Sequence, residues 1–250
     1  MTPFTIATAE SSSVKGHIVA NVQIHAKFVR TAAEHGVDVV VFPELSLTGY
    51  EPELAGGLIL TPEDTRHRLL HELSRRHDIT IIAGAPIYSG LEKPHIGALV
   101  FSSASSYKYA KKHLHGGEEV YFSPGAHPCV LDMQGVPVGL AICADITHPV
   151  HAREAAAHGA AIYAAGVLIT ENGYGPDTRL MQGYASDHAM LVVMANHSQP
   201  TGGHISAGKS AIWNEQGHKI AYAAGTEEVL VIAKRDADGW HGDVIHIGSK

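Results

Sequence analysis

Three residues of the chain carry side chains that together could break an amide bond. Cys143 supplies a thiol, Glu44 a carboxylate and Lys111 an ammonium group. A free thiol is mostly protonated at neutral pH, so a cysteine nucleophile needs a base and a positive environment. We expect Glu44 to be the base, and Lys111 with the backbone N–H of Ala144 to stabilise the oxyanion. Glu44 would then protonate the leaving amine and activate the water that hydrolyses the thioester.

Each of these residues follows the end of a predicted strand. Glu44 comes two residues after the run VDVVVF, Lys111 directly after SYKYA, and Cys143 directly after VPVGLAI. Because open α/β sheets form their ligand crevice at the carboxyl ends of strands, we expect the three side chains to converge there. A helix predicted to begin near Pro149 follows the cysteine. Its positive N-terminal end is expected to favour the thiolate.

Short apolar runs alternate with helical patterns over most of the chain. Several of the runs are continuously apolar, which indicates sheets that are buried on both faces and covered by helices. The predicted strands are 4–7, 37–42, 79–83, 97–101, 106–110, 136–142, 160–164, 191–195, 210–213, 219–223 and 228–233. The predicted helices are 18–35, 63–77, 150–158 and 178–189, the second with Thr61 as N-cap and Pro62 as its first residue. Loops expected to carry the site are 48–57, 113–128, 170–177 and 197–208.

Length and composition predict one large globular domain over residues 1–250, with 45% apolar and 17% charged residues. The formal charge of -7 argues against a nucleic-acid partner. No apolar run approaches the roughly 20 residues needed to span a bilayer, so no membrane partner is expected. The N-terminus MTPFTIATAE is interpreted as a strand and not as a signal peptide, which predicts a cytoplasmic location.

The chain has two cysteines and 19 histidines, residue types that could also support other chemistry. Cys129 has no charged partner in view and is interpreted as an inert buried thiol. The chain contains no HExxH or CxxC motif, and His67 and His71 stand among arginines, which is typical of a solvated helix face. We therefore expect no metal site and no organic cofactor.

Four segments resemble motifs of a known family. VVVFPELSLTGYEP, YAKKHLHGGEEVYFSPG and VGLAICAD are similar to the three catalytic motifs of the nitrilase superfamily, the carbon–nitrogen hydrolases. GKSAIWNEQG resembles that family's Gly-x-Ser-x-Ile…Gly strand pair, and the opening strand and the helix that contains Asn21 also fit. The resemblance runs from about residue 4 to residue 232. It implies an α/β fold, a four-layer αββα sandwich, which is commonly assembled as a homodimer or larger homo-oligomer.

By position, the resemblance assigns the family's glutamate to Glu44, its lysine to Lys111 and its nucleophile to Cys143. Family members also use a second glutamate, which orients the substrate and the lysine and precedes a Phe-x-Pro-Gly stretch. Counting back from FSPG in this chain, we prefer Glu118, with Glu119 as the alternative.

Departures from the family pattern concern the substrate. The nucleophile lies in Cys-Ala-Asp, whereas true nitrilases resemble Cys-Trp-Glu, so amide hydrolysis is favoured over nitrile hydrolysis. ITHPV replaces the Arg-Phe-Pro-Glu of many amidases, and GYASDH replaces their Ala-Arg-Ala…Glu-Asn helix. We expect a cysteine-dependent amidase acting on a small linear amide, carbamoyl or ω-amide compound. The alternatives are a nitrilase and a catalytically silent binding or scaffold protein with the same fold.

Further residues are candidates for the substrate pocket, namely Ala144, Tyr50, Asp145, His148 and Asn172. Two interpretations of Asp145 have equal weight: its carboxylate binds a backbone N–H of the following helix, or it binds the substrate. His113 is expected to brace its loop and not to transfer protons.

Overall fold

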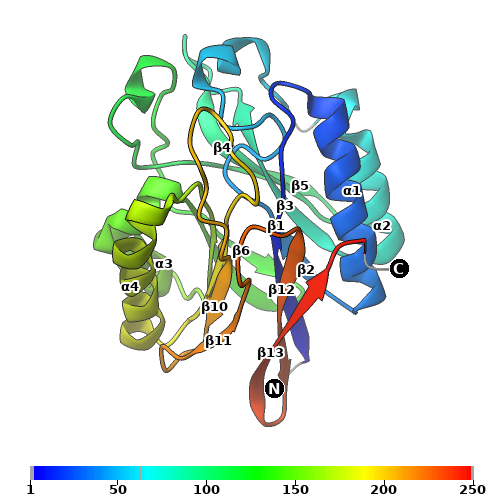
Figure 1. The fold of residues 1–250 in the computed structure, drawn as a ribbon, viewed down its shortest axis with the longest axis vertical. Coiled ribbons are helices and arrows are strands. Elements are labelled where there is room, and N and C mark those ends of the chain that lie inside the picture. Colours follow the sequence, from blue (N-terminus) through cyan, green and yellow to red (C-terminus); the bar gives the residue numbers. More distant parts are fainter. Residues whose placement is uncertain (1–2, 62, 249–250) are drawn as a thin grey trace.

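The computed structural model describes residues 3–61 and 63–248. Two β-sheets stack face to face, with helices α1 and α2 on the outer face of one and α3 and α4 on the outer face of the other (Figure 1). The four-layer αββα sandwich implied by the resemblance is therefore confirmed. Within the described residues, no helix is long and apolar enough to cross a membrane.

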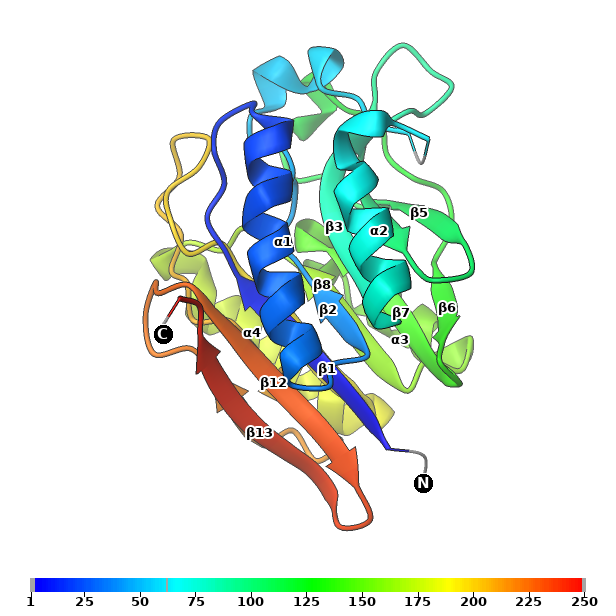
Figure 2. The same ribbon diagram turned by 90° about the vertical axis from the view of Figure 1, so that its right-hand side faces the viewer.

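The first sheet has seven strands in the order β13-β12-β1-β2-β3-β4-β5. Neighbours among β1, β2 and β3 are parallel, and the other pairs are antiparallel. Its strands are β1 (Phe4–Glu10), β2 (Val39–Val41), β3 (Thr80–Ile87), β4 (His95–Phe101), β5 (Ser106–Ala110), β12 (Val229–Asp236) and β13 (Gly239–His246). Figure 2 shows α1 and α2 lying side by side across this sheet.

The second sheet has six strands in the order β11-β10-β9-β8-β7-β6, with β7, β8 and β9 parallel to their neighbours in that group. Its strands are β6 (Val130–Met133), β7 (Val136–Ile142), β8 (Ile162–Gly166), β9 (Leu191–Ala195), β10 (Ala211–Trp213) and β11 (Lys219–Tyr222). The helices are α1 (Ile18–Glu34), α2 (Arg68–His77), α3 (Pro149–Ala157) and α4 (Glu171–His188). Short 3-10 turns are η1 (Pro52–Gly57), η2 (Thr65–His67), η3 (Glu118–Val120) and η4 (Cys143–Thr147).

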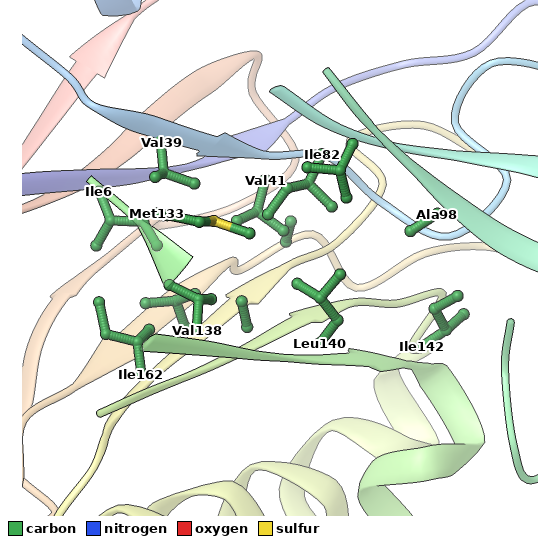
Figure 3. Packing of buried hydrophobic residues seen from close by; sticks show 14 of the residues in the cluster. Ile6, Val39, Val41, Ile82, Ala98, Met133, Val138, Leu140, Ile142 and Ile162 are labelled. Atoms are coloured by element: carbon green, nitrogen blue, oxygen red, sulfur yellow. The ribbon is translucent and has the colours of Figure 1, made fainter. Parts of the chain in front are cut away.

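The main core lies between the two sheets (Figure 3). Side chains alternate between the faces of a strand, so Val39 and Val41 of β2 enter this core while Val40 packs under α1 and α2. In β7, Val138 and Leu140 face the first sheet in the same way. Burial of one such side chain stabilises the fold by about 1.5–3 kcal/mol. Because β2 is apolar on both faces, it holds its own sheet against the second sheet on one side and against α1 and α2 on the other.

Every predicted strand is present, although several bounds differ by a few residues. Two strands, β6 and β13, were not predicted. The predicted helix 178–189 is also too short, because α4 begins at Glu171. Gly173, Gly175 and Pro176 disfavour a helix, but tertiary contacts hold this segment; the Tyr174 hydroxyl, for example, donates to the carbonyl oxygen of Lys209 at 2.8 Å.

The start of α2 was also predicted wrongly. The helical turn begins at Thr65, and the carboxylate of Asp64 accepts from the N–H of Arg66 at 2.8 Å, so Thr61 is not the N-cap. Pro62 lies outside the described residues. The solvated-face interpretation of His67 is wrong as well, because its side chain is fully buried and Nε2 donates to the carbonyl oxygen of Thr61 at 2.7 Å.

Candidate active site

The three residues singled out by their chemistry meet at one edge of the sandwich. Glu44 follows β2, Lys111 follows β5, and Cys143 follows β7. Nζ of Lys111 donates to Oε1 of Glu44 at 2.7 Å and to both carboxylate oxygens of Glu118 at 2.8 Å. The Lys111 side chain is fully buried, and the thiol lines the same cavity as the two glutamates. The convergence expected from the strand ends is confirmed.

Glu118, and not Glu119, belongs to this cluster. It lies in the turn η3 and is almost completely buried. Besides Lys111, it binds the hydroxyl of Tyr50, which donates to Oε1 at 2.8 Å, and the backbone N–H of His115, which donates to Oε2 at 2.7 Å. The exposed Glu119 instead accepts from the backbone N–H of Gly117 at 2.7 Å. Of the two glutamates that the sequence left open, only Glu118 lies where it can bind Lys111.

Charges in the cluster shift the protonation of its members. Burial raises the pKa of Glu44 to about 7, outweighing the opposite effect of Lys111, and the charge of Glu118 adds to the rise. Oε2 of Glu44 is buried and has no hydrogen-bond partner among the described residues. Although burial disfavours its charge, the pKa of Lys111 is raised by Glu44, Cys143 and Glu118, so it stays protonated. The cluster thus combines a fixed cation with a carboxyl that can gain or lose a proton near neutral pH.

Cys143 sits where β7 turns into η4, in a left-handed backbone conformation with φ 41°. Strained conformations of this kind cluster at active sites. Its Sγ donates to the carbonyl oxygen of Leu168 at 3.6 Å. Burial and the charge of Glu44 raise the pKa of the thiol well above its ordinary value, despite Lys111. The resting group is therefore a thiol. The contribution expected of the helix that begins at Pro149 stays a prediction.

The cavity beside the thiol has a volume of about 390 Å³, at the small end of the range for small-molecule pockets. Each of the four loops singled out in the sequence contributes to it, although part of 170–177 is helical. The lining residues are Glu44, Tyr50, His115, Glu118, Cys143, Ala144, Thr147, Leu168, Ile169, Thr170, Gly173, Asp177 and His204. Within the described residues, no group of three or more His, Cys, Asp and Glu side chains could hold a metal ion.

The structure places two of the five candidate pocket residues, Tyr50 and Ala144, in the cavity wall. His148 and Asn172 are exposed and do not line the cavity. The ring of His148 stacks on that of His113, with centroids 4.0 Å apart, which agrees with a bracing role for His113. Asn172 is the second residue of α4 and precedes Gly173, the lining residue of that turn.

Asp145 is buried and does not line the cavity, so its position favours a structural role. Its buried carboxylate accepts from the backbone N–H groups of Lys112 at 3.1 Å, His113 at 2.8 Å and Ile142 at 3.0 Å. The hydroxyl of Tyr109 donates to it at 2.6 Å. These N–H groups belong to the segment after β5 and to β7, not to the following helix. Asp145 therefore ties the segment that carries the lysine to the strand that carries the cysteine.

Sequence reasoning missed the residues that support the Glu44 turn. A Cβ added to Gly84 of β3 would lie 2.3 Å from the backbone nitrogen of Leu45, and one added to Gly166 of β8 would lie 2.5 Å from the carbonyl oxygen of Phe42. Only glycine allows the turn to pack this closely between the sheets. His197 also supports it, because Nε2 donates to the carbonyl oxygen of Glu44 at 2.8 Å. The one sequence feature that could have pointed to His197 is its place at the start of the loop 197–208, which was expected to carry part of the site.

Comparison with known proteins shows the family of the chain. Residues 5–241 match the carbon-nitrogen hydrolase family. The (R)-stereoselective amidase of a Pseudomonas species is 30% identical over 209 residues, which cover 80% of this chain and 74% of that protein. A nitrilase of Pyrococcus abyssi is 29% identical over 215 residues, covering 84% of this chain and 81% of that protein.

Longer proteins and solved structures match as well. The glutamine-dependent NAD(+) synthetase of Xylella fastidiosa is 32% identical over 151 residues, but the match covers only 27% of that protein, so the chain spans a fraction of its length. The amidase from Nesterenkonia sp. AN1, in a complex with butyramide, has a TM-score of 0.86 at 24% identity, covering 94% of this chain and 92% of that one. The chain therefore belongs to the carbon–nitrogen hydrolase family, within the nitrilase superfamily.

Proposed function

We propose that this protein is a cysteine-dependent amidase that hydrolyses a small linear amide through a thioester. The observation that carries the proposal is the buried Lys111, which donates to Glu44 and Glu118 at 2.7 and 2.8 Å beside the thiol of Cys143. Family membership supports a C–N bond as the target. The similarity to the Pseudomonas amidase supports an amide as the compound that contains this C–N bond.

In the first step, Oε2 of Glu44 accepts the proton of Cys143 while Sγ forms a bond to the amide carbon. The unbonded, buried Oε2 is suited to this task because its pKa is about 7. The carbonyl oxygen becomes an oxyanion, which receives hydrogen bonds from Nζ of Lys111 and the backbone N–H of Ala144. A turn that begins at Cys143 leaves its first N–H groups without partners inside the turn.

In the second step, Glu44 gives the proton to the amide nitrogen, the C–N bond breaks, and ammonia or an amine leaves the acyl-thioester. Glu44 then takes a proton from water, whose oxygen attacks the thioester carbon, and returns it to the sulfur as the acid departs. Glu118 holds the ammonium group of Lys111 through both carboxylate oxygens. Lys111 thereby stays charged and in place through both halves of the reaction.

Cys143→Ala tests the nucleophile. The variant should fold, because the thiol makes one weak hydrogen bond, and should release no ammonia from any amide hydrolysed by the wild type. The panel should contain short aliphatic amides, ω-amides including glutamine, and carbamoyl amines. Mass spectrometry of the wild type during turnover should show the acyl adduct on the peptide that contains Cys143. Cys129→Ala is the matched control and should retain turnover; activity in Cys143→Ala would refute the proposal.

Lys111→Ala tests the oxyanion donor. Loss of one such donor typically lowers kcat by about 10²–10³-fold, so a fall of that size is expected with a smaller change in KM. The variant leaves two buried carboxylates without their cation, so its thermal unfolding must be measured alongside its kinetics. A folded variant in which only KM rises would exclude the oxyanion role.

The similarity to the Pyrococcus nitrilase keeps nitrile hydrolysis as a second candidate. Ammonia and acid release from matched amide and nitrile pairs separates the two, since an amidase should act on the amide alone. A silent scaffold protein is tested by iodoacetamide. The reagent should label Cys143, which lines the cavity beside the proton acceptor Glu44, and spare Cys129, which has no such base beside it. Equal labelling of both thiols, with no turnover of the panel, would favour the scaffold.

A further inference from the structure

One carboxyl group of the cavity has no role in the proposed chemistry. Asp177 comes from α4, whose first two turns form part of the cavity wall. Thr170, Gly173 and Asp177 all line the cavity, and their spacing of three and four residues places them on one face of the helix. The side chain of Asp177 therefore borders the space that the substrate must fill.

Asp177 differs from the other two cavity carboxylates because no partner neutralises it. Glu44 and Glu118 both bind Lys111, whereas the carboxylate of Asp177 has no hydrogen bond or ion pair among the described residues. Burial raises its pKa above the ordinary value, although His115 opposes this electrostatically. No hydrogen bond joins Asp177 to His115 in the described part of the chain. A cationic ligand would supply the counter-charge that this half-buried carboxylate lacks.

The cavity wall as a whole, Asp177 included, carries no strong positive charge. Its ionisable residues are three carboxyls, two histidines, one tyrosine and the thiol, and none of the lining residues is lysine or arginine. The nearby Lys111 is already shared by two carboxylates. Such a cavity attracts a cation and repels an anion.

We propose that the substrate is an amide whose far end carries a protonated amino group, and that Asp177 binds this group as its counter-ion. The inference rests on the proposed amidase function, and it narrows the substrate class to small ω-amino amides. With the amide carbon at Cys143, the cavity of about 390 Å³ limits the length of the linker. A hydrogen-bonded charge pair of this kind corresponds to a preference of about 10- to 100-fold.

Matched substrates test the proposal directly. γ-Aminobutyramide and valeramide differ only by an ammonium group in place of a methyl group, and δ-aminovaleramide and hexanamide form a second pair. The wild type should show a kcat/KM about 10- to 100-fold higher for the cationic member of at least one pair, mainly through KM. The monoamide of glutarate, which carries a carboxylate at the same end, should be the poorest substrate.

Asp177→Asn keeps the shape of the side chain and removes its charge. It should reduce the cationic-to-neutral ratio of kcat/KM by at least about tenfold and improve turnover of the glutarate monoamide. Asp187→Asn makes the same charge change at an exposed position of the same helix and should leave the ratio unchanged. The inference is overturned if the wild type does not distinguish either pair, or if Asp177→Asn and Asp187→Asn behave alike.

Binding to the Cys143→Ala protein separates this inference from the proposed function. Calorimetry should show tighter binding of γ-aminobutyramide than of valeramide, and adding Asp177→Asn should abolish the difference. If no amide is turned over by the wild type but this pattern appears, the amidase function fails while the cation site stands. Equal binding of the two ligands, or binding of neither, overturns the cation site.

Discussion

Glu44 offers one bonded and one unbonded carboxylate oxygen to the cavity, and burial sets its pKa to about 7. Only the deprotonated form can accept the proton of Cys143. We therefore expect kcat/KM to rise with pH, with a midpoint near 7, and then to level off. The pKa of Cys143 is raised well above its ordinary value, so thiolate formation should add no second rise in this range. Amide hydrolysis measured from about pH 5 to about pH 9 gives the profile.

Variants of the same carboxyl identify the titrating group. Glu44→Gln should lose turnover at every pH, because the amide cannot accept the proton. Lys112→Ala, which removes a partly exposed cation next to Lys111 in the sequence and spares Glu44, should keep the midpoint. A flat profile in the wild type would show that a group other than Glu44 governs the first step.

The identities of Glu44, Lys111 and Cys143 could be predicted because each stands in a distinctive motif directly after an apolar strand. Asp145 was ambiguous, since a short acidic side chain beside a nucleophile fits both a ligand and a backbone brace. No motif around Cys143 indicates that burial raises the pKa of its thiol. Burial depends on which segments cover a residue, and those segments lie far away along the chain.

At the scale of elements, the Glu44 turn is held between strands of both sheets. Gly84 of β3 and Gly166 of β8 approach its backbone so closely that neither position has room for a Cβ. The N–H of Gly84 also donates to the hydroxyl of Ser46, which lies two residues after Glu44, at 3.1 Å. The turn is therefore positioned by backbone contacts that the catalytic motifs themselves do not contain.

Gly84→Ala should displace this turn. The added methyl group would lie 2.3 Å from the nitrogen of Leu45 and 2.5 Å from the carbonyl oxygen of Pro43, both backbone atoms that cannot rotate away. We expect a loss of about 1–3 kcal/mol of unfolding free energy and a lower kcat, measured by urea denaturation and amide turnover. Gly56→Ala is the control, because a Cβ there meets nothing within 4 Å. Equal stability and activity of the two variants would refute this account of Gly84.

Element existence was easier to predict than element limits. β7 was predicted with its observed bounds because its apolar run is bordered by turn residues. The first two turns of α4 were missed because Gly173, Gly175 and Pro176 are poor helix formers, and contacts such as that of Tyr174 with Lys209 decide the outcome. β13 is mostly polar or small and lies at a sheet edge, so its pairing with β12 left little pattern.

At the scale of the whole molecule, a buried carboxyl links the two sheets away from the cluster of Glu44, Lys111 and Glu118. Glu10 ends β1 in the first sheet, and its Oε2 accepts from the backbone N–H of Ser210, next to β10 of the second sheet, at 2.7 Å. Oε1 has no hydrogen-bond partner among the described residues. Burial, with a smaller contribution from Glu227, raises the pKa of Glu10 from its ordinary value of 4.5 to about 7.

This raised pKa makes the stability of the sandwich depend on pH. Between 4.5 and about 7 the folded protein keeps the Glu10 proton while the unfolded chain has released it. Folding is therefore disfavoured progressively as the pH rises through this window, and the full penalty is reached above it. Glu10→Gln cannot ionise, so it escapes the penalty.

The stability of Glu10→Gln relative to the wild type should increase by about 2 kcal/mol between about pH 5.5 and about pH 8, since titrations common to both proteins cancel. Urea denaturation at the two pH values measures the difference. Glu53→Gln, at an exposed glutamate, should show a much smaller change. If the Glu10→Gln difference is the same at both pH values, then Glu10 is ionised to the same extent in the folded and unfolded chains, and the carboxyl between the sheets imposes no penalty on folding.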